Sequence, residues 1–229
     1  MLFRSTYFES REDRKSQSRI DIVAVRWAKQ IVSAGADRII TMDLHSAQIG
    51  GFFYPTPVDH LYASYNITPF IRGLRIPNLI LVSPDTGGTA RIEKYAKHLN
   101  VDGLAFISKK RPGPNVVSNM RLSGDVAGKN TLILDDLVDG GGTIELATQV
   151  LRDAGAKDIH AICIHGLLSG EAVNRIKKCN LKSFTITNTI PHSSLGPFIQ
   201  IVSVTRVFAR AINAAYTGKS ISKLFIETK

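Results

Sequence analysis

Thr131-Leu-Ile-Leu-Asp-Asp-Leu-Val-Asp-Gly-Gly-Gly-Thr143 is the stretch of sequence that decides the fold. Its first half is a short apolar run, which is typical of a buried parallel strand. Acids and three glycines follow, and apolar residues then recur at helical spacing as far as Gly155, a residue type that commonly ends helices. The stretch therefore predicts a strand, a glycine-rich turn and a helix that opens at Thr143.

The same alternation of strands and helices recurs along the chain. The clearest helical patterns are residues 20–31, 88–99 and 143–154. The predicted strands are residues 38–43, 78–83, 103–108, 131–135, 158–165 and 184–187. Two segments rich in glycine and proline are predicted to be loops, residues 48–59 and 109–119. This alternation predicts an α/β fold with a mostly parallel sheet.

The composition is that of a chain that can bury a core in one large or two small domains. Of its 229 residues, 44% are hydrophobic, and the formal net charge of +10 suits anionic partners such as phosphorylated small molecules. The basic residues form only short groups, which disfavours a nucleic-acid-binding module. The sequence has no apolar run of membrane-spanning length, and Cys163 and Cys179 lack metal-binding spacing. We therefore expect a soluble, cytoplasmic protein without a membrane partner.

The acids and glycines of the opening stretch predict a sugar-phosphate site. Asp135 and Asp136 are expected at the carboxyl end of the strand, where α/β sheets bind ligands, and carboxylates accept hydrogen bonds from sugar hydroxyls. The glycines let backbone N–H groups approach a phosphate at the helix N-terminus. An ordinary turn capped by Asp139 is the alternative interpretation. Because adjacent carboxylates repel one another, the doubled acid favours function.

The segment DDLVDGGGT resembles the ribose-phosphate loop of type I phosphoribosyltransferases, and the chain from about Arg11 onward resembles ribose-phosphate diphosphokinase. Several motifs in the family's order are far more specific than one loop. They are RxDRKxxSR, TMDLHxxQIxGFF, VSPDxGG, the KxR of Lys109 and Arg111, and IHGLLSG.

The resemblance implies type I phosphoribosyltransferase-like parallel sheets flanked by helices, in tandem domains of which the first is truncated. Residues 1–64 would form the shortened N-terminal domain, with a C-terminal helix in residues 205–229 packed back on it. Residues 65–204 would form the domain that binds ribose phosphate.

On the sugar side, the resemblance makes Asp135 a ligand of the ribose hydroxyls, with Asp136 assisting. The implied cradle of the 5-phosphate is Asp139, Gly140, Gly141, Gly142 and Thr143.

On the nucleotide side, the resemblance makes His45 a magnesium ligand near the ATP phosphates, with Asp43 supporting it, and Asp85 a second magnesium site. By itself, a histidine at a strand end is more often structural, and Asp85 could be a helix N-cap. Arg11 and Glu12 align with an Arg-Gln pair that touches ATP in the family, so Glu12 is a departure.

The resemblance also implies the reaction. The anomeric hydroxyl of ribose 5-phosphate would attack the β-phosphorus of ATP and release AMP, with Mg²⁺ as cofactor, in a homo-oligomer that serves nucleotide biosynthesis. Lys109 and Arg111, placed just after a predicted strand, would close over the reacting phosphates; a solvated charge cluster is the alternative.

Two other functions stay open. One is a noncatalytic, synthetase-like subunit, which the shortened first domain and Tyr54, in place of a family aspartate, favour. The other is a salvage phosphoribosyltransferase, which would share the sugar-phosphate loop but would leave the motifs around His45 unexplained.

Overall fold

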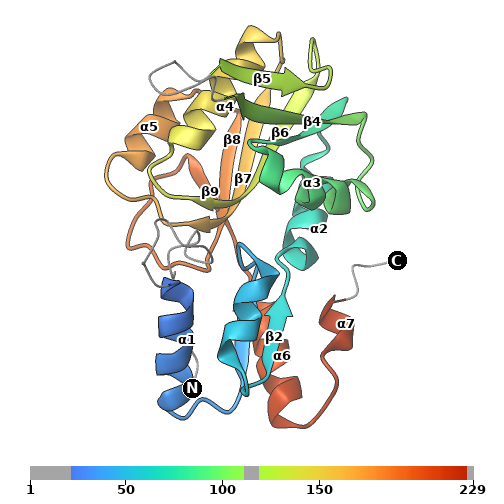
Figure 1. The fold of residues 1–229 in the computed structure, drawn as a ribbon. Coiled ribbons are helices and arrows are strands. Elements are labelled where there is room, and N and C mark those ends of the chain that lie inside the picture. The colour runs from blue at the N-terminus through green and yellow to red at the C-terminus, as the bar shows by residue number, and fades with distance from the viewer. Residues whose placement is uncertain (1–21, 111–118, 226–229) are drawn as a thin grey trace. The chain divides into compact units, whose positions relative to one another are not determined.

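A computed structural model describes residues 22–110 and 119–225 of the chain (Figure 1). None of the helices in these two ranges is both long enough and apolar enough to cross a membrane. The description does not include the side chains of four predicted site residues, Arg11, Glu12, Lys109 and Arg111.

The described residues form two compact units. The large unit contains residues 66–203, and the small unit contains residues 22–65 together with residues 204–225. Each unit has its own sheet.

The large unit is built on a seven-stranded sheet in the order β5-β4-β3-β6-β7-β8-β9. Neighbouring strands are parallel except β4 and β5, which are antiparallel. All of β3 and nearly all of β6 is buried, as expected for central strands covered on both faces. The strands are β3 (Leu79–Ser83), β4 (Gly103–Lys110), β5 (Asn119–Ser123), β6 (Asn130–Val138), β7 (Ile159–Gly166), β8 (Ser183–Thr187) and β9 (Ile199–Val202).

The order of the strands reverses between β3 and β6. The chain passes from β3 to β4 in one direction across the sheet and from β6 to β7 and β8 in the other. Because crossovers between parallel strands are right-handed, this reversal places α3 on the face opposite α4 and α5. The carboxyl ends of β3 and β6 therefore flank a switch point, which is where α/β sheets bind ligands.

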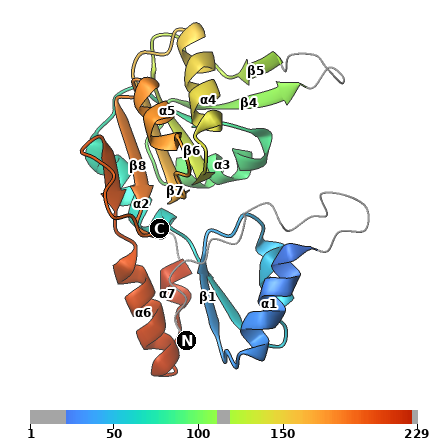
Figure 2. The ribbon, with the colours of Figure 1, turned by 90° about the vertical axis from the view of Figure 1, so that its left-hand side faces the viewer.

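The helices of this unit cover the sheet with their apolar stripes. In α4, Ile144, Ala147 and Leu151 are buried, and their spacing of three and four residues puts them on one face. That face packs into a core that includes Ile133 of β6 and Phe184 of β8. Helices α4 and α5 lie side by side (Figures 1 and 2). The helical elements around this sheet are α2 (Ser64–Leu74), η2 (Thr86–Gly88), α3 (Thr89–Ala96), α4 (Gly142–Asp153) and α5 (Ala172–Lys178).

The small unit contains a parallel pair of strands, with α1 on one side of it and α6 on the other (Figure 2). Ala28, Ile31 and Phe53 form a small buried cluster between α1 and the 3₁₀ helix η1. In α6, Val207 and Ala211 are buried one turn apart. The elements are α1 (Val23–Ser33), β1 (Ile39–Met42), η1 (Ala47–Phe53), β2 (Val58–Leu61), α6 (Thr205–Tyr216) and α7 (Ser222–Phe225).

The structure confirms the predicted α/β fold but corrects both predicted loops. The first half of residues 48–59 lies in η1, and the segment ends in β2, which pairs with β1. The strand was missed because only the two ends of Val58–Leu61 are apolar, so its stability comes from pairing with β1 and not from a local pattern. In residues 109–119, β4 extends to Lys110 and β5 begins at Asn119.

Two corrections concern the predicted site. Lys109 lies within β4, paired with Met120, and not after the strand. Asp135 and Asp136 lie inside β6, because the ladder with β7 continues as far as Val138 opposite Gly166. The strand was predicted to end at Asp135, and it ends three residues later, at Val138.

The close approach of β7 and β8 gives a test of this packing. A Cβ on buried Gly166 would lie 2.7 Å from Cδ1 and 3.2 Å from Cβ of buried Ile186, so this side chain or the backbone would have to shift. We expect Gly166→Ala to lower the free energy of unfolding by about 1–3 kcal/mol in urea denaturation. The control is Gly73→Ala in α2, where a Cβ meets nothing within 4 Å; it should be neutral or stabilise by up to about 1 kcal/mol. Equal stability of the two variants would contradict the packing.

Candidate functional site

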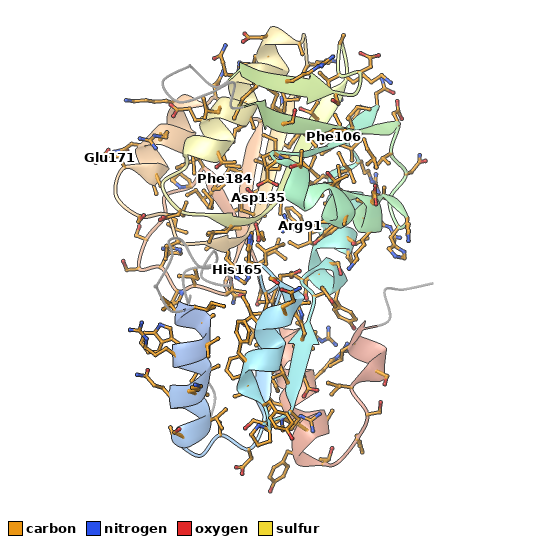
Figure 3. All side chains as sticks on the ribbon, viewed as in Figure 1. Arg91, Phe106, Asp135, His165, Glu171 and Phe184 are labelled. Atoms are coloured by element: carbon orange, nitrogen blue, oxygen red, sulfur yellow. The ribbon has the colours of Figure 1, made fainter. Side chains whose placement is uncertain are left out.

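Two buried carboxylates of β6 share one arginine. Asp135 and Asp136 are each 8% exposed. Arg91 reaches them from α3, with Nη1 at 3.4 Å from Oδ1 of Asp135 and Nη2 at 3.2 Å from Oδ2 of Asp136 (Figure 3). The site thus holds two acids and one paired cation in a place with little water.

This arrangement raises the pKa of Asp135 well above its usual value. Burial is the main cause, because it disfavours the charged form, and the charge and hydrogen bond of Asp136 add to it. Arg91 lowers the pKa of Asp135 but does not cancel the rise. Cys163, the partner of Asp135 across the β6–β7 ladder, is fully buried, and burial likewise raises the pKa of its thiol. A protonated carboxyl can donate as well as accept a hydrogen bond, which suits a sugar hydroxyl.

Asp85 follows β3 and caps the next turn. Its Oδ1 accepts a hydrogen bond of 2.9 Å from the backbone N–H of Gly88, as the N-cap interpretation predicts. A Cβ on Gly88 would lie 2.5 Å from Oγ of Ser83, so the turn requires glycine. The charge of Asp85 also helps to raise the pKa of Asp135, which places the two acids in one electrostatic environment at the switch point.

The glycine turn after β6 presents the N-terminus of α4. Gly141 has φ 77°, and a Cβ there would lie 3.2 Å from Cγ1 of Ile176, so only glycine fits without strain. The first helical hydrogen bond runs from the N–H of Glu145 to the carbonyl of Gly141 at 3.0 Å. The backbone N–H groups of residues 142–144 therefore have no acceptor within the helix, which is the arrangement that binds anions.

Asp139 does not cap this helix. The N-cap is Gly141, without a side-chain cap hydrogen bond, and the Asp139 carboxylate instead accepts a hydrogen bond from the hydroxyl of Ser169. The capping role that the alternative interpretation gives to Asp139 is therefore wrong, and its carboxylate does not occupy the amides at the start of α4.

In the small unit, the residues around His45 are anchored from β2. Asp43 has φ 42°, which is unusual for a residue other than glycine, and its Oδ2 accepts a 2.6 Å hydrogen bond from the N–H of Ala63. The N–H of Leu44 donates to Nε2 of His60 at 3.1 Å. Contacts at Asp43 and at Leu44 thus hold the backbone that leads into His45.

The predicted site residues divide between the two units. Asp85, Asp135, Asp136 and the glycine turn belong to the large unit, whereas Asp43 and His45 belong to the small unit. Within residues 22–110 and 119–225, no three His, Cys, Asp or Glu side chains form a group that could hold a metal ion.

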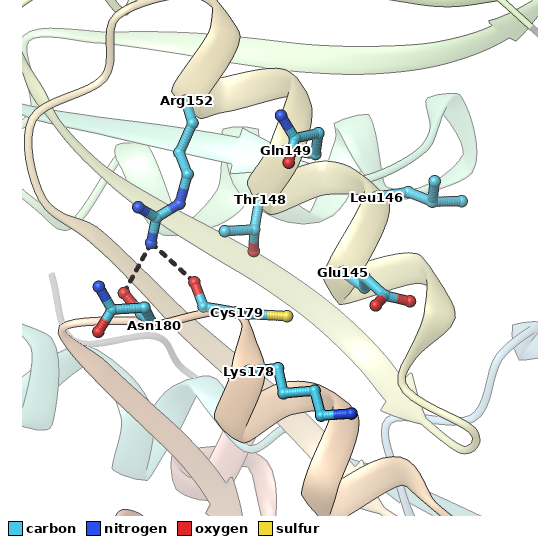
Figure 4. A pocket seen from close by; sticks show the side chains of 8 residues that line it. All are labelled: Glu145, Leu146, Thr148, Gln149, Arg152, Lys178, Cys179 and Asn180. Carbon is cyan, nitrogen blue, oxygen red and sulfur yellow. Dashed lines mark hydrogen bonds between the residues drawn. The ribbon is translucent and has the colours of Figure 1, made fainter.

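A hollow of about 400 Å³ lies elsewhere on the large unit, between α4 and α5 (Figure 4). None of the predicted site residues lines it. Arg152 closes one side by donating hydrogen bonds of 2.7 Å to the carbonyls of Cys179 and Asn180 (Figure 4). The other lining residues are Glu145, Leu146, Thr148, Gln149 and Lys178.

Comparison with known proteins agrees with this geometry. Residues 83–226 match the model of the phosphoribosyl synthetase-associated domain. The chain is 42% identical to a ribose-phosphate pyrophosphokinase of Campylobacter jejuni, over 95% of this chain and 70% of that protein. The chain belongs to the ribose-phosphate pyrophosphokinase family. The enzyme of the same name from Bacillus caldolyticus is 41% identical, over 96% of this chain and 70% of that one.

A solved member of the family has the same fold. The crystal structure of phosphoribosylpyrophosphate synthetase from Mycobacterium smegmatis superposes with a TM-score of 0.83, at 37% identity, over 91% of this chain and 68% of that one. The predicted type I phosphoribosyltransferase-like fold, with parallel sheets flanked by helices, is therefore confirmed.

Three side chains around the site were not predicted from the sequence. Arg91 pairs with both acids of β6, while Ser169 and Arg175 contact the glycine turn from the segment after β7. Ser169 lies in the motif IHGLLSG, which was recognised as part of the family resemblance but was given no role. Arg91 and Arg175 lie in helices, where a single arginine gives no sign of a distant partner.

The raised pKa of Asp135 predicts an effect of pH on stability. The folded chain holds this proton more tightly than the unfolded chain, so the free energy of unfolding should fall as pH rises from about 4 through the raised pKa. Asp136→Asn removes the neighbouring charge and should make this fall smaller. Urea denaturation at several pH values measures it.

Asp153→Asn, at an exposed carboxylate on α4 that accepts a hydrogen bond from Gln149, is the control and should follow the unmodified chain. If Asp136→Asn also follows the unmodified chain at every pH, the two acids of β6 do not interact as described.

Proposed function

We propose that this chain transfers the diphosphoryl group of ATP to the anomeric hydroxyl of ribose 5-phosphate, giving phosphoribosyl diphosphate and AMP. One observation carries the proposal: a left-handed glycine turn presents amides that have no acceptor within their helix, shortly after two buried carboxylates, at the switch point of the sheet. Relatives named ribose-phosphate pyrophosphokinase, at about 42% identity, support it.

The sugar phosphate would bind along β6 and the turn that follows it. The 5-phosphate would accept hydrogen bonds from the N–H groups at the start of α4, where the helix dipole favours negative charge. Asp135 and Asp136 would hold the ribose hydroxyls, since they lie in β6, the strand that leads into the turn. Two recognition elements on one short segment would fix both ends of the sugar and orient its anomeric hydroxyl.

The nucleotide would bind with magnesium. His45, with Asp43 supporting it, is the proposed magnesium ligand near the ATP phosphates, and Asp85 is the proposed second magnesium site. Magnesium is usually held by one or two protein carboxylates together with phosphate oxygens and water, and when bound it neutralises phosphate charge. Asp85 fits such a role, because its Oδ1 caps Gly88 while its other oxygen accepts no hydrogen bond within the described residues.

Catalysis would rest on positioning and charge. Lys109 at the end of β4, with Arg111, would stabilise the negative charge that develops on the transferred and leaving phosphates. Arg11 and Glu12 are proposed contacts to ATP. Self-association into a homo-oligomer is part of the same proposal.

An assay for AMP formed from ATP, ribose 5-phosphate and Mg²⁺ tests the function. Lys109→Ala should lower kcat by roughly 10²-fold or more, because it removes a charge placed for the transition state, and should leave the melting temperature unchanged. The matched control is Lys157→Ala, an exposed lysine before β7, which should keep full activity.

Other outcomes identify the alternatives. AMP formed equally well without ribose 5-phosphate would reject the proposed transfer. Binding of ribose 5-phosphate in calorimetry without turnover would identify a noncatalytic subunit. Release of pyrophosphate from phosphoribosyl diphosphate and a free base would identify a salvage phosphoribosyltransferase.

A further inference from the structure

The glycine turn after β6 is held from outside by the segment that follows β7. The hydroxyl of Ser169 donates to the carboxylate of Asp139. Nη1 of Arg175, on α5, donates a 2.8 Å hydrogen bond to the carbonyl oxygen of Gly140. The N–H groups of Leu167 and Leu168 donate to the carbonyl of Val138 at 2.8 and 3.2 Å, so this one segment contacts three consecutive residues, 138–140.

Helix α5 also packs against the turn. The position of a Cβ on Gly141 lies 3.2 Å from Cγ1 of Ile176 and 3.3 Å from the carbonyl oxygen of Ala172. Ala172 and Ile176 are buried. Nε of Arg175 lies 3.4 Å from Oε2 of Glu145 in the first turn of α4, so this arginine joins the turn to the helix that the turn begins.

The hydrogen bond from Arg175 to the carbonyl oxygen of Gly140 also orients the N–H of Gly141. The peptide unit that joins Gly140 to Gly141 is planar and trans, so its carbonyl oxygen and its N–H point in opposite directions. A donor on α5 that holds the oxygen therefore turns the N–H of Gly141 away from α5. Three successive glycines have wide backbone freedom, and without such a contact this peptide plane could rotate at little cost.

We propose that Arg175 is a positioning residue for phosphate binding: by holding the carbonyl of Gly140 it keeps the amides of the glycine turn directed outward, toward the 5-phosphate of the sugar. This inference rests on the proposed function of that turn. Arg175 acts through the backbone of the turn, and Ser169 fixes the preceding residue in the same way through Asp139.

Arg152 provides a matched control. It too joins α4 and α5 by donating to backbone carbonyls, those of Cys179 and Asn180 at 2.7 Å each (Figure 4). Its contacts lie at the opposite end of α5 from Ala172 and do not include the glycine turn. Loss of either arginine removes a bond between the same two helices, but only loss of Arg175 frees the Gly140 peptide.

Calorimetry of the full chain with three probes tests the inference: ribose 5-phosphate, inorganic phosphate and ATP. We expect Arg175→Met to weaken binding of ribose 5-phosphate and of inorganic phosphate roughly tenfold, because a hydrogen bond from a charged donor is lost. Binding of ATP should be unchanged. Arg175→Lys keeps a charged donor and should recover part of the affinity, and Arg152→Met should leave the affinity for all three probes unchanged.

The outcomes separate the two proposals. If the unmodified chain binds neither ribose 5-phosphate nor inorganic phosphate, the proposed function of the turn fails. If it binds them, and Arg175→Met binds them equally well or loses affinity for ATP to the same extent, the positioning role of Arg175 is overturned. Thermal melting of each variant shows whether it is folded, and the comparison with Arg152→Met accounts for any general loss of stability.

Discussion

The left-handed backbone at Gly141 is the constraint on which the rest of the site depends. With φ 77° at this residue the chain passes from the end of β6 into α4 within a short turn, so that the amides without an acceptor in the helix lie just beyond the strand. A Cβ at this position would lie 3.2 Å from Cγ1 of Ile176, a tight contact that adds to the strain of the positive φ. Geometry and packing thus favour glycine at the same place, and they leave a helix terminus of the kind that attracts anions.

The carboxylate pair shows a conflict between stability and function. Asp135 and Asp136 lie inside a buried strand and share Arg91 as a paired cation, and burial with mutual repulsion raises the pKa of Asp135. Groups of this kind weaken a fold unless a ligand or a proton relieves them. A sugar with neighbouring hydroxyls could provide that relief, since each hydroxyl can donate a hydrogen bond to a carboxylate.

The elements around the site could be predicted from the sequence because their patterns are local. The apolar run of β6 and the helical spacing of α4 gave these elements nearly correct bounds, within one to three residues. Strand β2 was missed because it depends on pairing with β1. Strand β5 was also missed, although Met120 and Leu122 alternate with polar residues, because the pattern is short and follows a segment rich in glycine and proline.

The site was predictable as far as its chemistry lies in one stretch of sequence. The order of the acids and glycines in residues 135–143 is enough to predict a sugar-phosphate site. The contacts of Arg91 and Arg175 could not be predicted, because their partners, Asp135 and Gly140 respectively, lie more than thirty positions away in the sequence. Arginine is also common on helix surfaces. Only the fold shows such contacts.

The central claim is that the amides at the start of α4 bind the sugar's phosphate, and amide NMR spectra of the isotope-labelled chain test it most directly. On titration with ribose 5-phosphate, the backbone N–H signals of residues 141–144 should move, and inorganic phosphate should move the same signals. Ribose without a phosphate should not. If ribose 5-phosphate binds while these signals stay in place, or if ribose alone moves them equally, the account is contradicted.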